Sequence, residues 1–179
     1  MKRTTLFWIL AIVITLVSAF YQRVTGPTYP LTGKVILDEK EIPYKLERSK
    51  ETTEDYRIRI TTNDPMIIGV LYWKKHNTND EYKAVPMNGN NILYADLPAQ
   101  KRLEKLDYYI TLTKRNVMVT IPNEKNVTIR FKDPVPIWVL IPHIFAMFFA
   151  MMLSTRSGLE FFNKDPNLKK LGLWTVIVL

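Results

Sequence analysis

The amino-acid sequence predicts a mainly β domain flanked by membrane-spanning α-helices. Two observations carry this prediction. Apolar residues gather near the two ends of the chain, in runs that approach the roughly 20 residues a spanning helix needs. Between these runs, apolar and polar residues alternate with a period of two, which is typical of strands that bury one face. We therefore expect a transmembrane segment, then an extracytoplasmic β-sandwich, then further hydrophobic helices.

The first segment, residues 1–22, has Lys2 and Arg3 ahead of an uncharged run from Leu6 to Tyr21. Its length and its aromatic end fit a transmembrane anchor that stays in the mature protein. A secretory signal peptide fits as well, with Val17-Ser18-Ala19 as a small-residue cleavage site. Both alternatives send the residues that follow across a membrane.

The second apolar run, residues 135–153, is long enough to span a bilayer as a helix. Residues 154–170 carry Lys and Arg, and positively charged flanks of this kind stay in the cytoplasm. The third run, residues 171–179, is too short to span, so we expect it to begin a further transmembrane helix of a longer, truncated protein. The same charge rule places residues 26–133 outside the cytoplasm. In a bacterium this side would be the periplasmic space at the inner (plasma) membrane.

The net charge of +8 comes partly from these flanks. Residues 26–133 hold 18 Lys and Arg against 15 Asp and Glu, a near balance that argues against a nucleic-acid partner. The expected partners are the lipid bilayer and another membrane or envelope protein. Because the chain has no cysteine, the exported domain must be stable without disulfides, and it has no thiolate metal site or cysteine nucleophile.

Seven or eight short stretches of the middle region have strand patterns. In the clearest of them, Tyr56, Ile58 and Ile60 alternate with Arg57 and Arg59. The other stretches are KVIL with the Ile42 and Tyr44 that follow it, MIIGVLYWKK, EYKAVPM, ILYADL, LDYYITLTK, VMVTI and VTIRF. Strands at a spacing of about ten residues, with turn residues between them, predict an all-β sandwich.

One stretch, AVPMNGNNILYADLPAQKRLEKLDYYITLT, resembles fibronectin type III-like and immunoglobulin-like modules of bacterial exported proteins. In those modules a strand ends in a small residue and a motif such as IPAQ, and a strand containing YYI follows a connector. The matching residues here are Tyr94, Ala95, Leu97, Pro98, Ala99, Gln100, Leu106, Tyr108, Tyr109 and Ile110. The resemblance covers residues 67–128 and concerns fold; it implies no catalytic residues.

The resemblance also implies a tyrosine corner, in which the hydroxyl of Tyr108 or Tyr109 bonds back to the backbone of the connector. The connector of this chain departs from the family pattern. It has Lys101, Arg102 and Glu104 where Pro and Gly are usual.

His143 is the candidate for chemistry inside the second apolar run. Met147 and Met151 follow at i+4 and i+8, so the three side chains share one helix face. Imidazole and thioether groups ligate haem iron and copper, so these residues are the candidate cofactor site. The alternative is a packing role, in which the imidazole bonds across helices and the methionines fill gaps. We expect packing, and hence no cofactor and no metal.

Trp73 and His76 are the candidates for partner binding in the middle domain. Trp73 follows Tyr72 directly, so one of these two aromatic side chains faces outward and can anchor a partner beside His76. A core aromatic and a solvated loop histidine are the alternatives. No sequence motif for a hydrolase, a zinc enzyme or a phosphate loop is present, so we expect no catalytic residues.

The expected function is protein interaction or assembly through the sandwich, without catalysis of its own. The alternative is a subunit of a membrane redox or transport complex, whose site near His143 is completed by helices outside this chain. A redox subunit absorbs visible light when purified, whereas an interaction module is colourless.

Overall fold

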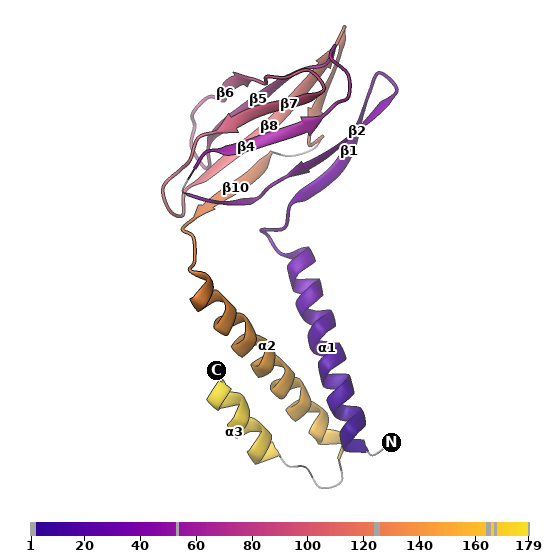
Figure 1. Cartoon of the computed structure of the whole chain (residues 1–179), viewed down its shortest axis with the longest axis vertical. Helices are drawn as coiled ribbons and strands as arrows, with labels where there is room; N and C mark the ends of the chain where they lie inside the picture. The colour runs from indigo at the N-terminus through magenta and orange to yellow at the C-terminus, as the bar shows by residue number, and fades with distance from the viewer. Residues whose placement is uncertain (1–2, 53, 124–125, 164–165, 167, 179) are drawn as a thin grey trace. The chain divides into compact units, whose positions relative to one another are not determined.

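The chain divides into two units, a β domain from Pro27 to Pro134 and a helical unit formed by the residues before and after it (Figure 1). The structure is a computed structural model, and it describes residues 3–52, 54–123, 126–163, 166 and 168–178. Each unit has its own internal packing.

All the stretches with a period of two form strands in the β domain. The described strands are β1 (Leu31–Leu37), β2 (Lys40–Leu46), β3 (Ser49–Glu51), β4 (Tyr56–Thr61), β5 (Ile68–Lys75), β6 (Lys83–Pro86), β7 (Ile92–Leu97), β8 (Lys105–Lys114), β9 (Val117–Ile121) and β10 (Val127–Lys132). The predicted strands are therefore confirmed. Only β3 lies outside the predicted stretches, because its three residues carry no apolar alternation.

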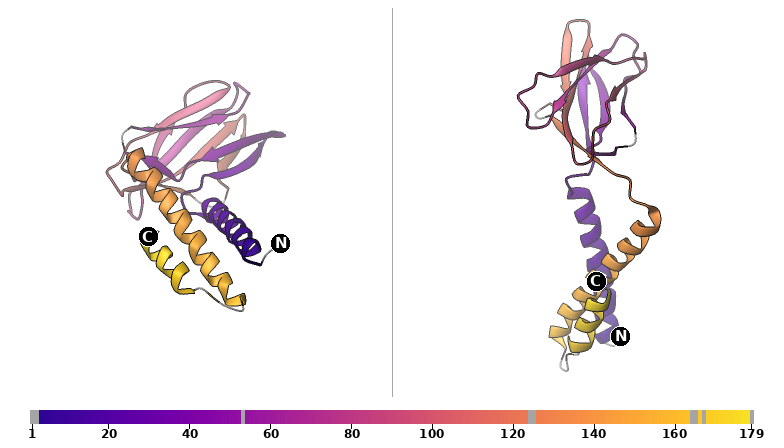
Figure 2. Two further views of the ribbon diagram at one scale, coloured as in Figure 1. Left: turned by 60° about the horizontal axis from the view of Figure 1, so that its bottom comes forward. Right: turned by 90° about the vertical axis from the view of Figure 1, so that its left-hand side faces the viewer.

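The strands form one large sheet and two antiparallel pairs. The main sheet has the order β3-β10-β8-β5-β6, with β9 paired to β8 beyond the end of β10. Within it β3 runs parallel to β10 and the other pairs are antiparallel, so the sheet is mixed. The pairs β1-β2 and β4-β7 complete the domain. Figure 2 shows these sheets enclosing a common interior, an arrangement compatible with a β-sandwich-like fold.

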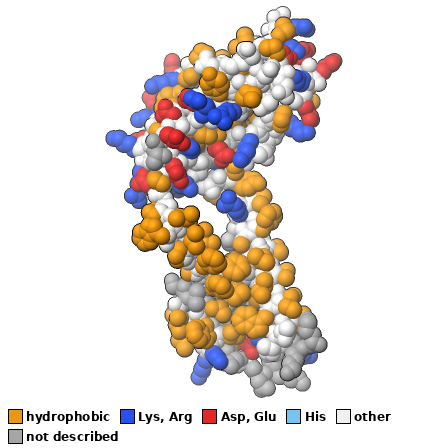
Figure 3. Space-filling view, in the orientation of Figure 1, with side chains coloured by type: hydrophobic (Ala, Val, Ile, Leu, Met, Phe, Trp, Pro, Cys, Tyr) orange, Lys and Arg blue, Asp and Glu red, His pale blue; other side chains and the backbone are white. Residues whose placement is uncertain are grey.

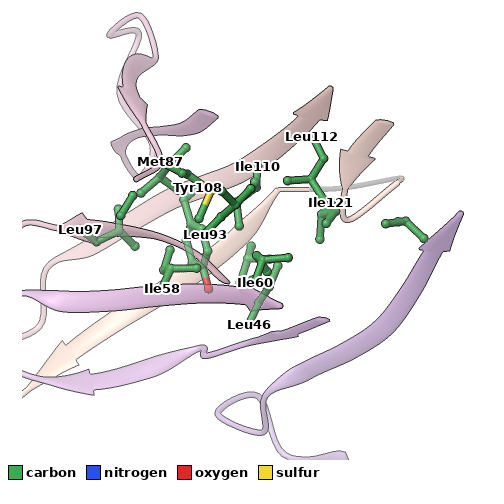
Figure 4. Close-up of a cluster of buried hydrophobic side chains, with 14 of the residues drawn as sticks. Leu46, Ile58, Ile60, Met87, Leu93, Leu97, Tyr108, Ile110, Leu112 and Ile121 are labelled. Carbon is green, nitrogen blue, oxygen red and sulfur yellow. The ribbon is translucent and has the colours of Figure 1, made fainter. Parts of the chain in front are cut away.

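The alternation of β8 positions the core. Its inward side chains, Leu106, Tyr108, Ile110 and Leu112, are all fully buried. They meet buried side chains from β2, β4, β7 and β9, among them Leu46, Ile58, Ile60, Leu93, Leu97 and Ile121 (Figure 4). Buried aliphatic and aromatic surface is the main stabilising term of such a domain. One continuous core is what a domain without disulfides requires.

The tyrosine corner is not formed as expected. Tyr108 is buried as a corner tyrosine would be, but its hydroxyl donates to the carbonyl oxygen of Glu47, at 2.8 Å. Glu47 lies between β2 and β3, on the far side of the core, and not in the connector before β8. Tyr109 does not fill the role either, since its ring stacks on Tyr72 of the neighbouring strand. The inward direction of Tyr108 points its hydroxyl across the core, which is why it reaches Glu47.

Lys114, the last residue of β8, joins three segments of the domain. Its Nζ lies 2.6 Å from Asp38 Oδ2 in the β1–β2 turn and 3.0 Å from Asp64 Oδ2 before β5. The hydrogen bond from Lys114 lowers the pKa of Asp38. The pKa of Asp64 is lowered first by the backbone N–H of Met66 and then by Lys114. The two carboxylates in turn raise the pKa of Lys114.

The helical unit contains α1 (Arg3–Thr25), α2 (Ile137–Leu159), the short 3₁₀ helix η1 (Glu160–Phe162) and α3 (Leu168–Val178). α1 and α3 both pack on α2, and Figure 2 shows α3 beside α2 in both views. Hydrophobic side chains cover the visible surface of α1 and α2, whereas charged side chains gather on the β domain (Figure 3). The two long helices thus present apolar groups outward.

Small residues bring α1 and α2 together. Ala11 and Thr15 of α1 are fully buried, and Ala150 of α2 is 5 % exposed. Residues four apart lie on one face of a helix, so Ala11 and Thr15 form a single contact stripe. Small side chains at such a contact let two helix backbones approach closely.

At the C-terminal end of α2, Arg156 forms a buried ion pair with Glu160, the first residue of η1. The side chains of both residues are about 5 % exposed or less. The Arg156 guanidinium lies 5.5 Å from the ring centroids of both Phe7 and Trp8 of α1. Asn163 donates to the other carboxylate oxygen of Glu160, at 2.9 Å. The first turns of α1 therefore cover this charged pair, which would be exposed without them.

Replacing Tyr108 with Phe tests the bond across the core. We expect Y108F to lower the free energy of unfolding by about 1 kcal/mol, because the Glu47 carbonyl loses its donor. Burial raises the pKa of Tyr108 well above its ordinary value, so the hydroxyl remains a donor at all ordinary pH values. The measurement is denaturant unfolding of the whole chain in detergent, with Y109F as the matched control. An equal loss in both variants would contradict the role assigned to Tyr108.

The Lys114 ion pairs predict a dependence of stability on pH. Asp38 and Asp64 have folded-state pKa values below their ordinary value of 3.8, so their contribution is present above that pH and is lost as the pH falls through the lowered values. We expect the wild type to lose more stability than Lys114→Met between about pH 6 and about pH 2.5. Lys34→Met, which removes an exposed pair with Glu41, is the control. Parallel acid profiles for wild type and Lys114→Met would overturn this expectation.

Candidate functional site

The outer face of the main sheet carries a cluster of aromatic and polar side chains. Alternation along β5 and β8 directs Tyr72 and Tyr109 to this face, and the two residues are direct partners in the ladder. Their rings stack with centroids 4.9 Å apart and planes 8° from parallel. Tyr82, from the segment before β6, meets the edge of Tyr109 with centroids 5.0 Å apart. We call Tyr72, Tyr82 and Tyr109 the tyrosine face.

Polar groups surround the tyrosine face on the same side of the sheet. The Nζ of Lys74 lies 5.1 Å from the ring centroid of Tyr82, a cation–π contact. Asn126 donates from Nδ2 to the Tyr82 hydroxyl oxygen. Burial is the main cause that raises the pKa of both Tyr82 and Tyr109. The phenols are therefore neutral at physiological pH, and their hydroxyl groups can donate hydrogen bonds.

Asp107 ties the loop after β5 to this face. Its two carboxylate oxygens both lie 2.9 Å from Nδ1 of His76, and Thr128 donates to Oδ1 at 2.6 Å. The side chain of Asp107 is only 14 % exposed, so these contacts are partly shielded from water. Thr128 bonds to the carboxylate and not to the imidazole. The three residues therefore fix the loop and do not form a nucleophile–base relay.

The structure separates the two residues proposed for partner binding. Tyr72, not Trp73, is the outward member of the aromatic pair; Trp73 packs against the core, with Lys83 Nζ 5.0 Å from its ring centroid. His76 lies on the side of the tyrosine face. Trp73 lines a hollow of about 600 Å³ and His76 lines another of about 350 Å³. Lys75 and Gln100 line both hollows, so the two candidates belong to adjacent sites and not to one.

His143, Met147 and Met151 lie along α2 as the spacing predicts. His143 is exposed, Met147 is 53 % exposed and Met151 is half-buried. Within the described residues, no three side chains of His, Cys, Asp or Glu come together as metal ligands. The packing role expected for these three residues and the alternative, a haem or copper site, both stay predictions.

Sequence reasoning missed Asp107 and Tyr109 as site residues, although a signal for them exists. In LDYYITLTK the buried set is Leu106, Tyr108, Ile110 and Leu112, so strict alternation assigns Asp107 and Tyr109 to the other face. The contacts of Tyr82 and Asn126 carry no such signal, because both residues lie outside strands and reach the face from distant parts of the chain.

Comparisons with known proteins do not assign this chain to a family. No protein-family model matches the chain, and no curated protein matches it.

Replacing Asp107 with Asn tests whether the carboxylate holds the His76 loop. We expect D107N to lower the stability of the domain by about 1.5 kcal/mol, the usual contribution of hydrogen bonds to a charged group. Amide hydrogen exchange in residues 76–80 should also be faster in D107N than in the wild type. Asp96→Asn is the matched control, because its bidentate pair with Arg57 is exposed and contributes little to stability. If both variants behave alike, Asp107 has no special role.

Proposed function

We propose that this chain is an integral membrane protein whose β domain serves protein interaction or assembly at the membrane surface. Two helices, Arg3–Thr25 and Ile137–Phe162, are long and apolar enough to cross a membrane. Only 17 % and 6 % of their most apolar windows are buried, whereas a core helix of a soluble protein is mostly buried. A lipid environment accounts for this much outward apolar surface.

The packing of α1 supports a retained anchor over a cleaved signal peptide. Cleavage after Ala19 would remove Ala11 and Thr15, which are fully buried in the helical unit. It would also remove Phe7 and Trp8 from the Arg156 guanidinium. Losing these contacts would leave the buried Arg156–Glu160 pair uncovered, so the protein is more stable with α1 in place. Lys2 and Arg3 then hold the N-terminus in the cytoplasm and the β domain outside it, in a bacterial inner membrane.

The tyrosine face is the single observation that carries the interaction role. It is a half-buried surface of three phenol rings, with a lysine, a carboxylate and an amide at its border. Tyrosine offers a large rigid contact area and a hydroxyl group at low entropic cost, which is why it is enriched at protein interfaces. Rigid β-strands hold the central pair, Tyr72 and Tyr109, in place before any partner binds.

We also propose that the sandwich belongs to the fibronectin type III-like or immunoglobulin-like class. The support is the resemblance of residues 67–128 and the enclosure of one core by the main sheet and the smaller strand pairs. The bond of Tyr108 to Glu47 is a departure from that class.

A membrane redox or transport subunit is the second candidate, and it rests on the exposure of His143. An ionisable side chain on the outer surface of a spanning helix is costly unless another group meets it. A neighbouring helix that supplies ligands would complete a site with Met147. Visible absorbance of the purified protein that disappears on His143→Leu would favour this candidate.

Site-specific photo-crosslinking tests the interaction role. A benzoylphenylalanine in place of Tyr109 should form one adduct of defined mass in native membranes. The same group in place of Tyr94, a 37 % exposed tyrosine of β7 that lies beside Arg57, should form none. Tyr72→Ala should weaken the adduct, because it removes the stacked partner of position 109. Equal labelling from positions 109 and 94 would show that the tyrosine face is not the contact.

A further inference from the structure

The turn between β7 and β8 is a feature that the interaction role leaves unexplained. Glu104 N donates to Lys101 O at 3.0 Å, which closes a four-residue turn over residues 101–104. Leu103, its third residue, has a φ of +70°. That position and sign ordinarily call for glycine, because a side chain there is strained. The Leu103 side chain is also 55 % exposed, so burial in the domain core does not offset the strain.

The turn is held firmly against the end of β10. Leu103 N donates to Phe131 O, and Phe131 N donates to Glu104 O, both at 3.0 Å. Phe131 is itself fully buried in the core. The exposed leucine is therefore presented on a fixed backbone and not on a loose loop.

Basic residues lie within the turn and next to it. Lys101 and Arg102 belong to the turn, and Lys105 follows it at the start of β8. Lys75 and Lys105 line, together with Leu103, the hollow of about 350 Å³.

Two carboxylates lie at this turn. Glu104, which also lines the hollow, accepts a hydrogen bond at Oε2 from the backbone N of Lys101, at 3.2 Å. Arg102 Nε lies 3.7 Å from Asp133 Oδ2, a loose and exposed pair. In the part of the chain that the structure describes, the ammonium groups of Lys75, Lys101 and Lys105 form no ion pair within 4.0 Å. An exposed apolar side chain in a segment with a surplus of basic residues suits the boundary between the headgroups and the acyl chains of an anionic bilayer.

The length of the chain limits how far this turn can lie from a membrane. Leu103 is hydrogen-bonded to Phe131, and only residues 132–136 separate Phe131 from the start of α2 at Ile137. A fully extended chain covers at most about 3.6 Å per residue, so six steps reach about 20 Å. A span that begins at Ile137 thus keeps this end of the β domain within reach of the headgroup layer.

We propose that the Lys101–Glu104 turn docks on the surface of an anionic phospholipid bilayer. Leu103 enters the headgroup layer, and Lys75, Lys101, Arg102 and Lys105 face the lipid phosphates. This inference rests on the proposal that α2 spans the membrane. It assigns a lipid-binding role to a part of the β domain that the tyrosine face does not include.

The absence of cysteine makes the test direct, because one introduced cysteine is the only site that a thiol-reactive dye can label. The full chain with Leu103→Cys carries an environment-sensitive NBD dye and is reconstituted in nanodiscs with nitroxide-labelled lipids. We expect the lipid nitroxides to quench the dye and acrylamide in the water phase to reach it poorly. Addition of anionic phosphatidylglycerol to a zwitterionic bilayer should strengthen both effects.

Two control positions distinguish failure of the docking inference from failure of the proposal that α2 spans the membrane. Met118→Cys labels an exposed site (66 %) beside Thr113, near the far end of β8, and should stay open to acrylamide. Phe145→Cys labels an exposed site (59 %) of α2 and should be quenched by the lipids. If position 145 is quenched while 103 behaves like 118, the docking inference is wrong and the spanning helix stands. If position 145 is open to acrylamide, both proposals fail.

Charge variants test the lipid chemistry. In the dye-labelled Leu103→Cys chain, changing Lys101, Arg102 and Lys105 to Gln should weaken docking on anionic bilayers by about fivefold per cation. Lys34→Gln with Lys45→Gln, two exposed lysines of β1 and β2, is the matched control and should leave quenching unchanged. Near-ultraviolet circular dichroism confirms that each labelled variant is folded. A folded triple variant that keeps its preference for anionic bilayers would overturn the proposed role of these cations.

Discussion

Strand β8 has to satisfy two environments at once, and the rest of the β domain depends on how it does so. It pairs with β5, β9 and β10, so neither of its edges is left for solvent over most of its length. Its inward residues are fully buried, whereas its outward residues, Asp107, Tyr109, Thr111 and Thr113, are half-buried. A slip of one residue in register would exchange these two sets, placing Asp107 in the core and Leu106 in water. The register of β8 therefore fixes both the hydrophobic core and the candidate interaction surface.

Much of this arrangement follows from local sequence pattern, and the remainder depends on contacts between distant residues. Alternation predicted the strands, and it assigned opposite faces to Tyr72 and Trp73, although it did not say which of the two faces outward. The answer comes from Leu71, whose burial places Trp73 on the inner side. β3 could not be predicted, because Ser49–Glu51 is extended only through its pairing with Arg130 to Lys132 of β10. The partner of Tyr108, 61 residues away, has no local signal for the same reason.

In the helical unit, too, the sequence pattern predicts the helices but not the contacts between them. Apolar runs suffice to predict α1 and α2, but nothing in the sequence indicates that Arg156 will be buried. Removal of a charged pair from water is costly, and the attraction within the pair offsets the cost only when geometry and neighbours are favourable. Here the carboxylate of Glu160 also accepts from Asn163, and two aromatic rings of α1 face the guanidinium. The buried pair therefore contributes less to net stability than to the choice of which face of α1 meets α2.

The two ends of β8 use their cations in opposite ways, and the difference bears on function. The side chain of Lys114 is 14 % exposed and its ammonium group lies between two carboxylates, so its charge is used within the domain to join turns. At the other end, Lys105 and Lys75 line a hollow together with Leu103, an exposed leucine on a strained backbone. Within the described residues, Lys75, Lys101 and Lys105 have no ion-pair partner, and they lie at the end where the chain leaves for α2. The proposed contact with an anionic bilayer would give these charges a partner outside the domain.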